Sequence, residues 1–212
     1  MKYSQLYRIC TFCCMPLLLG IVIAVDPPSD HFYYTDGLEQ TYDMAVATQF
    51  WCNSMGYDAE RYEDEEDDYL ESRAEEVALW WYFGHGHLDG NKARLNCNGG
   101  SLAYWKWVRA VDIEGLDCDD IILVYAAACY SLSADDLADA FIDEGADAYI
   151  GHDGLLYESG AYYVSSHFAQ NCDAGMTISA ALTDAQDEWN EDPDDGHCTY
   201  FSIEGDTSTR LD

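Results

Sequence analysis

Two stretches, VALWWYFGHGH (Val77–His87) and IILVYAAACYS (Ile121–Ser131), decide the predicted fold. Each begins with a run, Val77–Phe83 or Ile121–Ala127, that is apolar on both faces. Such runs are typical of central strands in a parallel sheet that helices cover on each side. The sequence therefore predicts an α/β fold of three layers, with a central, mostly parallel sheet flanked by helices.

A histidine and a cysteine follow these two strands. His85 stands just past the first and Cys129 just past the second. Because the functional crevice of such sheets lies outside the carboxyl ends of the strands, we expect both side chains there. Taken singly, a Cys at a strand end is more often a small core residue. Together they are candidates for nucleophilic catalysis, since a Cys needs a nearby base.

The remaining pattern predicts helices alternating with strands. Glu39–Ser54 reads as a helix that Gly56 ends, with Tyr42, Ala45, Val46 and Phe50 on or near one face. Ser133 is the expected N-cap of a helix that Gly145 ends. Leu88–Tyr104 reads as a long loop that forms a substrate wall. Further helices are expected at Tyr162–Phe168 and Thr177–Trp189, and further strands at His31–Thr35, Ala146–Gly151 and Cys198–Ile203.

The first 24 residues form a separate segment. Lys2 and Arg8 precede an apolar stretch over Ile9–Val25. This layout is typical of a secretory signal that is cut after Ala24, and an uncleaved membrane anchor is the alternative. Both place the body, residues 25–212 read as one domain, outside the cytoplasm, and both limit membrane contact to this segment.

The chain is strongly acidic, with a formal net charge of −32. Removing Met1–Ala24, which carries two cations and no acids, would leave −34. A surface this acidic repels nucleic acid and anionic membranes, so polyanion binding is not expected. Solvation in salty surroundings is the ordinary explanation of the charge, and attraction of basic substrates is the sharper one. The acidic run Glu63–Asp68 reads as a solvated loop, and calcium binding is the alternative, although the run lacks the spacing of calcium ligands. No cofactor is required for the expected chemistry.

Cysteine placement leaves the disulfide pattern and the oligomeric state open. Three of the nine cysteines lie in the N-terminal segment. If Cys129 is a free thiol, an odd number remains in the body, so at least one more is unpaired or bonds another chain. The six body cysteines are Cys52, Cys97, Cys118, Cys129, Cys172 and Cys198.

The order of the two motifs matches a peptidase layout in which His lies about 50 residues upstream of a Cys that follows Ala. The chain resembles the caspase-fold (clan CD) cysteine peptidases, in which an apolar strand ends in His-Gly and a later one in Ala-Cys. Here these are Phe83-Gly84-His85-Gly86 and Ala127-Ala128-Cys129. LADAFIDEGADAYIG (Leu137–Gly151) and the terminal IEGDTSTRL (Ile203–Leu211) resemble the gingipain branch, with Thr207 where that branch has Pro.

This resemblance implies a cysteine endopeptidase that acts on peptide or protein substrates. Cys129 would attack the scissile carbonyl, and His85 would supply a proton to the leaving amine. The backbone N–H groups of Gly86 and Cys129 are the implied oxyanion hole, because glycine permits close backbone approach. The negative field of the body opposes thiolate formation, so a cationic or hydrogen-bonding neighbour must counter it. His85 is the first candidate for that neighbour and His87 the second.

Four residues near the expected crevice are candidates for the substrate pocket: Asp89, Asp153, His152 and His87. An acid in that pocket would favour Arg or Lys before the cleaved bond, whereas an ordinary surface carboxylate would not. His87 is an alternate base, a pocket residue or an exposed bystander, since the His-Gly motif assigns the catalytic role to His85.

Two other functions compete with peptidase activity. One is a metallohydrolase that binds zinc through His85, His87, His152 and Cys129, although a complete (β/α)₈ barrel generally needs more residues than this chain has. The other is a catalytically silent caspase-fold module that binds partners at the cell surface.

Overall fold

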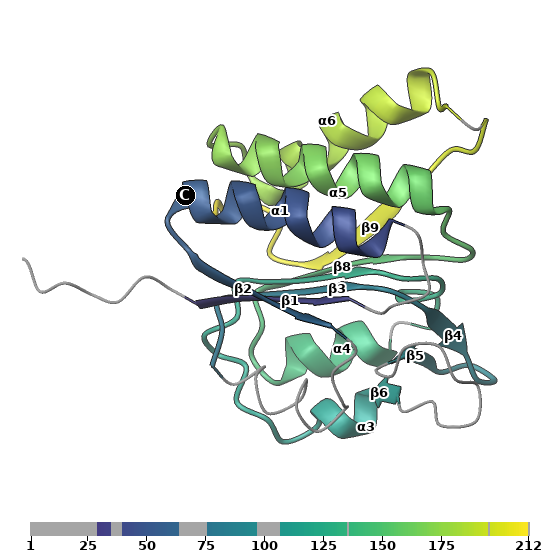
Figure 1. The fold of residues 1–212 in the computed structure, drawn as a ribbon. Coiled ribbons are helices and arrows are strands. Elements are labelled where there is room, and N and C mark those ends of the chain that lie inside the picture. Colours follow the sequence, from purple (N-terminus) through teal and green to yellow (C-terminus); the bar gives the residue numbers. More distant parts are fainter. Residues whose placement is uncertain are drawn as a thin grey trace, which may run out of the picture.

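The computed structural model describes residues 29–34, 40–63, 76–96, 107–134, 136–194 and 196–211. Its centre is a six-stranded sheet with the order β2-β1-β3-β7-β8-β9 (Figure 1). All neighbouring strands run parallel except β9, which is antiparallel to β8. The strands are β1 (Ser29–Tyr34), β2 (Asp58–Glu63), β3 (Leu79–Phe83), β7 (Leu123–Ala127), β8 (Ala148–His152) and β9 (Phe201–Gly205).

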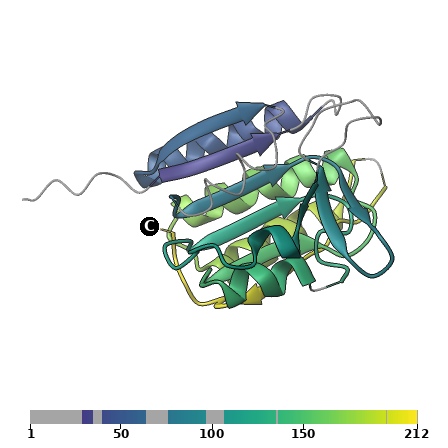
Figure 2. The same ribbon diagram turned by 90° about the horizontal axis from the view of Figure 1, so that it is seen from below.

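Helices cover both faces of this sheet, which confirms the expected three layers. Figure 1 shows α1 (Thr41–Met55), α5 (Glu158–Asp173) and α6 (Ile178–Glu191) on one face. The other face carries α3 (Ala110–Ile113) and α4 (Asp136–Asp143). A small antiparallel sheet, β4 (Gly86–Leu88), β5 (Ala93–Asn96) and β6 (Trp107–Arg109), lies beside α3 and α4 (Figures 1 and 2). No described helix combines the length and apolar composition that crossing a bilayer requires.

The central strand β3 shows why the apolar runs form this sheet. All five of its residues are buried. Trp81 and Phe83 pack in the core beneath α1 and α5, while Trp80 and Tyr82 pack in the core on the side of α4. Because successive side chains of a strand point to opposite faces, a strand covered on both sides must be apolar throughout.

Of the four apolar residues expected on or near one face of α1, only Ala45 is buried. Tyr42, Val46 and Phe50 are 51%, 36% and 64% exposed. The buried stripe instead includes two threonines, and Thr48 satisfies its hydroxyl by donating to the Met44 carbonyl at 2.8 Å. This local bond lets a polar side chain face the core. The whole stripe is Thr41, Met44, Ala45, Thr48 and Cys52.

Three other local expectations need correction. Helix α4 begins at Asp136, and the Ser133 hydroxyl accepts a bond from Gly154 N–H at 3.1 Å, so Ser133 is not its N-cap. The expected loop Leu88–Tyr104 contains β5, and its residues 97–104 lie outside the described residues. Glu63 is the last residue of β2 rather than part of a loop, and residues 64–68 of the acidic run also lie outside the described residues, as does the N-terminal segment 1–24.

Candidate active site

The pairing of β3 with β7 brings His85 and Cys129 to the same place. These parallel neighbours are in register from Leu79–Leu123 to Phe83–Ala127. The ladder continues one step further, because Gly84 N–H donates to the Ala127 carbonyl at 3.2 Å. His85 and Cys129 therefore each stand two residues beyond a paired position, on strands about 4.8 Å apart. Both lie at the carboxyl edge of the sheet, as predicted.

A small cavity of about 150 Å³ opens at this edge, and both residues line it. Ligand pockets for whole small molecules are usually about 300–1,000 Å³, so this volume suits a single side chain of a longer substrate. The walls come from the ends of β3 and β7, from the start of α1 and from the segment that leads into α5. The lining residues are Thr41, Met44, Gly84, His85, Ala127, Cys129, Leu156, Glu158 and Ala161.

Cys129 is a partly buried free thiol held by the segment after β8. The Leu156 N–H donates to Cys129 Sγ at 3.3 Å, and Sγ lies 3.8 Å from the Leu156 carbonyl oxygen. These two backbone contacts hold the sulfur against the segment that leads into α5. The Leu156 N–H is a hydrogen-bonding neighbour of the thiol, and it has no signature in the sequence.

The backbone of the His85 segment is fixed from two sides. The His85 carbonyl accepts from Asn96 N–H at 2.9 Å and from the Tyr82 hydroxyl at 3.0 Å. At Gly86, a Cβ atom would lie only 1.9 Å from the Cys129 carbonyl oxygen. The chain that follows His85 thus passes directly against the backbone of Cys129, and only glycine fits there.

His87 and Asp89 lie away from the Cys129 cavity. His87 is exposed on β4, with its ring 5.7 Å from that of Trp107. Asp89 is also exposed and forms an ion pair with Arg94, whose guanidinium lies over Trp107 at 5.1 Å. His87 therefore has the geometry of the exposed bystander among its three predicted roles.

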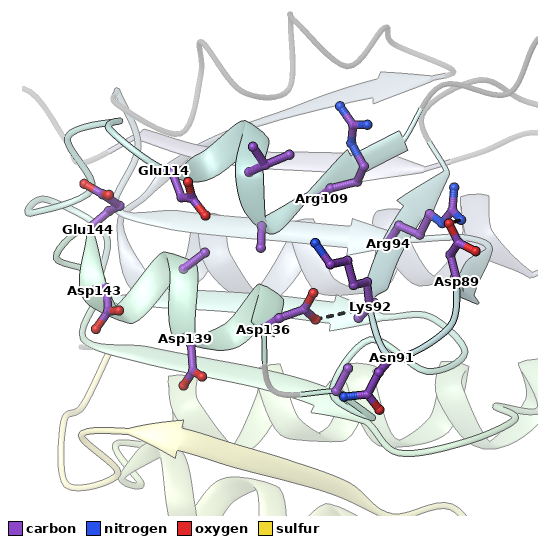
Figure 3. A pocket seen from close by; sticks show the side chains of 15 residues that line it. Asp89, Asn91, Lys92, Arg94, Arg109, Glu114, Asp136, Asp139, Asp143 and Glu144 are labelled. Atoms are coloured by element: carbon purple, nitrogen blue, oxygen red, sulfur yellow. Dashed lines mark hydrogen bonds and ion pairs between the residues drawn. The ribbon is translucent and has the colours of Figure 1, made fainter.

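Asp89 lines a second, larger cavity of about 690 Å³ on the side of α3 and α4. Figure 3 shows the cations of this cavity, Lys92, Arg94 and Arg109, toward one end, with Glu114, Asp143 and Glu144 toward the other. Three of these groups are engaged locally: Arg94 pairs with Asp89, Arg109 pairs with Asp112, and Glu144 accepts from Gly115 N–H at 2.7 Å.

His152 and Asp153 do not line the Cys129 cavity either. His152 is only 7% exposed, and its ring meets Phe201 edge-on at 5.6 Å. Burial lowers the pKa of His152, so this imidazole is neutral at pH 7. Asp153 is exposed in the turn that follows β8. Among the described residues, no three His, Cys, Asp or Glu side chains converge as a metal site would require.

Glu158 is the acid that does line the cavity, and the sequence interpretation did not select it. It is the first residue of α5 and is half-buried. Thr41 and Met44, from the first turn of α1, were also missed. The usable signal was the rule that helices following strands begin at the carboxyl edge of the sheet, where ligands bind. Applied to the segment after β8, the rule points beyond Asp153 to the start of the next helix.

Comparison with known proteins agrees with this architecture. A family model described as peptidase family C25 matches residues 20–212. The crystal structure of the Arg specific cysteine proteinase gingipain R (RGPB) superposes with a TM-score of 0.63 at 13% identity, covering 86% of this chain and 47% of that one. A complex of Porphyromonas gingivalis RgpB pro- and mature domains gives 0.60 at 12% identity, covering 84% and 47%. These similarities show a shared caspase-like fold.

An uncharacterized protein of Archaeoglobus fulgidus is 29% identical over 113 residues, which are 51% of this chain and 51% of the relative. The chain thus spans about half the length of the proteins it resembles. The family model, in contrast, matches nearly all of it. The chain therefore belongs to peptidase family C25.

Proposed function

We propose that this chain is a cysteine endopeptidase in which Cys129 is the nucleophile and His85 the proton donor. The observation that carries the proposal is that His85 and Cys129 line one cavity, with the Leu156 N–H donating to the thiol. Family membership supports the same reaction class. In hydrolysis, Sγ bonds to the scissile carbonyl carbon, and the C–N bond breaks as the amine takes a proton from His85. Water then attacks the acyl carbon, the C–S bond breaks to release the acid, and a proton of the water returns to His85.

The oxyanion of the tetrahedral intermediate needs donors at the same edge. We assign this role to the backbone N–H groups of Gly86 and Cys129. The close approach of Gly86 to the Cys129 carbonyl supports the assignment, since it places the Gly86 peptide next to the backbone of the residue that carries the thiol. Preorganised backbone donors of this kind are usually among the largest contributions to acyl-transfer catalysis.

The proposed substrate preference is Arg or Lys before the cleaved bond. Glu158 supports it, because a carboxylate in a cavity sized for one side chain can pair with a guanidinium or ammonium group. Gingipain R, whose structure is similar to this chain, is described as an Arg specific cysteine proteinase, which supports the same class of substrate. The net charge of −32 would add a long-range attraction for basic peptides, which salt should weaken more than the direct contact.

A panel of fluorogenic peptides that differ only in the residue before the cut tests the function. We expect peptide-bond hydrolysis, with Arg and Lys substrates cleaved fastest, and we expect prior alkylation by iodoacetamide to abolish it. Hydrolysis that survives complete alkylation of Cys129 would contradict the thiol mechanism. Equal rates on Arg, Ala and Asp peptides would contradict the basic preference alone.

Replacing Glu158 by Gln should lower kcat/KM for Arg and Lys peptides by roughly 10- to 100-fold, because the substrate cation loses its partner in a half-buried site. Rates on neutral peptides should change much less. Asp89→Asn and Asp153→Asn are matched controls, since both acids are exposed and neither lines the cavity. An unchanged ratio of basic to neutral rates in Glu158→Gln, or a lowered ratio in either control, would show that Glu158 is not the pocket acid.

A further inference from the structure

The turn that presents Cys129 has an unfavourable backbone conformation. Tyr130, the next residue, has φ +59°, the one positive φ among described residues other than glycine. For a bulky side chain this left-handed region is sparsely populated, and such a residue stays there only where its surroundings hold it. One hydrogen bond that holds the turn runs from the Tyr130 N–H to the Gly154 carbonyl at 2.7 Å.

The buried hydroxyl of Ser131 forms the other hydrogen bonds that hold the turn. Its Oγ lies 2.8 Å from the Ala126 carbonyl of β7 and 3.0 Å from the carbonyl of Ala128, the residue before Cys129. The one hydroxyl proton is therefore shared between these two carbonyl groups. The same oxygen accepts from His152 N–H at 2.9 Å. Ser131 is fully buried, so water cannot replace any of these partners. A single hydroxyl thereby joins the end of β7 to the end of β8.

The neighbours of Ser131 leave it little freedom. Its carbonyl accepts from the Tyr149 hydroxyl at 3.0 Å. Burial raises the pKa of Tyr149, which keeps this phenol protonated and able to donate. A Cβ atom at Gly151 would come within 3.0 Å of Ser131 Oγ, so the two strand ends are in tight contact here.

We propose that Ser131 is a positioning residue for Cys129: its hydroxyl holds the strained turn that keeps Sγ against the Leu156 N–H and beside His85. This inference rests on the proposed function for its catalytic consequence. Without the hydroxyl, the Ala128 carbonyl and the His152 N–H lose a partner on either side of the turn. The turn can then relax at Tyr130, and relaxation moves the adjacent Cys129 away from its donor.

The test compares Ser131→Ala with Ser165→Ala. Ser165 is equally buried, and its hydroxyl is hydrogen-bonded to that of Tyr125 at 2.9 Å on the other face of the sheet, so it is a matched deletion that does not involve the Cys129 turn. Both variants should lower Tm by several degrees. Only Ser131→Ala should lower kcat, by at least about 10-fold with KM little changed, because a small misplacement of reacting atoms is costly.

Alkylation of Cys129 by iodoacetamide, followed by mass spectrometry across a pH series, gives a readout that needs no peptidase activity. In Ser131→Ala the pH of half-maximal rate should rise by roughly half a unit or more, as the thiolate loses its N–H donor. If the parent protein cleaves no peptide but this shift occurs, the positioning role holds and the proposed function fails.

Tyr149→Phe removes one hydrogen-bond donor to the turn and should show a smaller shift in the same direction. This variant replaces Ser131→Ala in the test if Ser131→Ala does not fold. Folded Ser131→Ala protein with parental kcat and an unshifted alkylation profile would overturn the proposal. If Ser131→Ala does not fold, an unshifted profile in Tyr149→Phe would overturn it.

Discussion

Cys129→Ala should lose peptide hydrolysis by at least about 1,000-fold, because the substitution removes the atom that forms the acyl intermediate. The fold should persist, since Cys129 is only partly buried and lies past the end of β7. The measurement is kcat/KM on the best basic peptide, with circular dichroism to confirm the folded state. Hydrolysis by folded Cys129→Ala protein at the parental rate would refute the nucleophile assignment.

His85→Ala should give a loss of similar size, since the leaving amine would depart without a proton donor. His87→Ala is the matched control, because it removes the same side chain two residues further along the same segment. His87 is exposed and does not line the Cys129 cavity, so its replacement should retain most of the activity. A larger loss in His87→Ala than in His85→Ala would reverse the two histidines' roles.

Gly86→Ala is a third substitution with a large expected effect. The new Cβ would lie 1.9 Å from the Cys129 carbonyl oxygen and 2.9 Å from its carbonyl carbon. Relieving that overlap needs a shift of about 1 Å or more in one of the two segments, and a displacement of that size can cost about 100-fold in rate. We therefore expect kcat/KM to fall by about 100-fold or more, with a lower Tm from overpacking.

Gly90→Ala is the control for this experiment. Gly90 has φ +65°, but a Cβ there would meet nothing within 4 Å. Its replacement should cost about 1 kcal/mol of stability through backbone strain alone and leave the rate near the parental value. Parental activity in Gly86→Ala would show that the close contact of the two segments does not matter for catalysis.

The sheet and its two reactive strand ends were predictable because local pattern carries their information. Val77–Phe83 and Ile121–Ala127 are apolar on both faces, and in the structure they contain β3 and β7 as adjacent parallel strands. Adjacent parallel strands end at the same edge, so the meeting of His85 and Cys129 followed from strand order.

The pocket acid and the face of α1 were not predictable in the same way. Asp89 and Asp153 follow strands in sequence, but the direction of a side chain past a strand end depends on the loop. The structure turns Asp89 toward Arg94 and places Glu158 at the cavity instead. On α1, Thr48 is buried through a bond to its own helix, which hydropathy alone does not reveal. The N–H of Leu156 is a backbone group, so side-chain identity cannot indicate it.

Competition between two thiols of the same molecule tests the central claim most directly. Cys129 is partly buried in the cavity, whereas Cys198 is exposed, and both are free thiols. A peptide-like chloromethyl ketone with Arg at the reactive end would be added at limiting concentration and the labelled residues identified by mass spectrometry. We predict that Cys129 is labelled at least about 10-fold faster than Cys198, because reactivity follows thiolate character and substrate binding rather than exposure. Labelling that follows exposure, with Cys198 modified first and Cys129 protected, would contradict a catalytic Cys129.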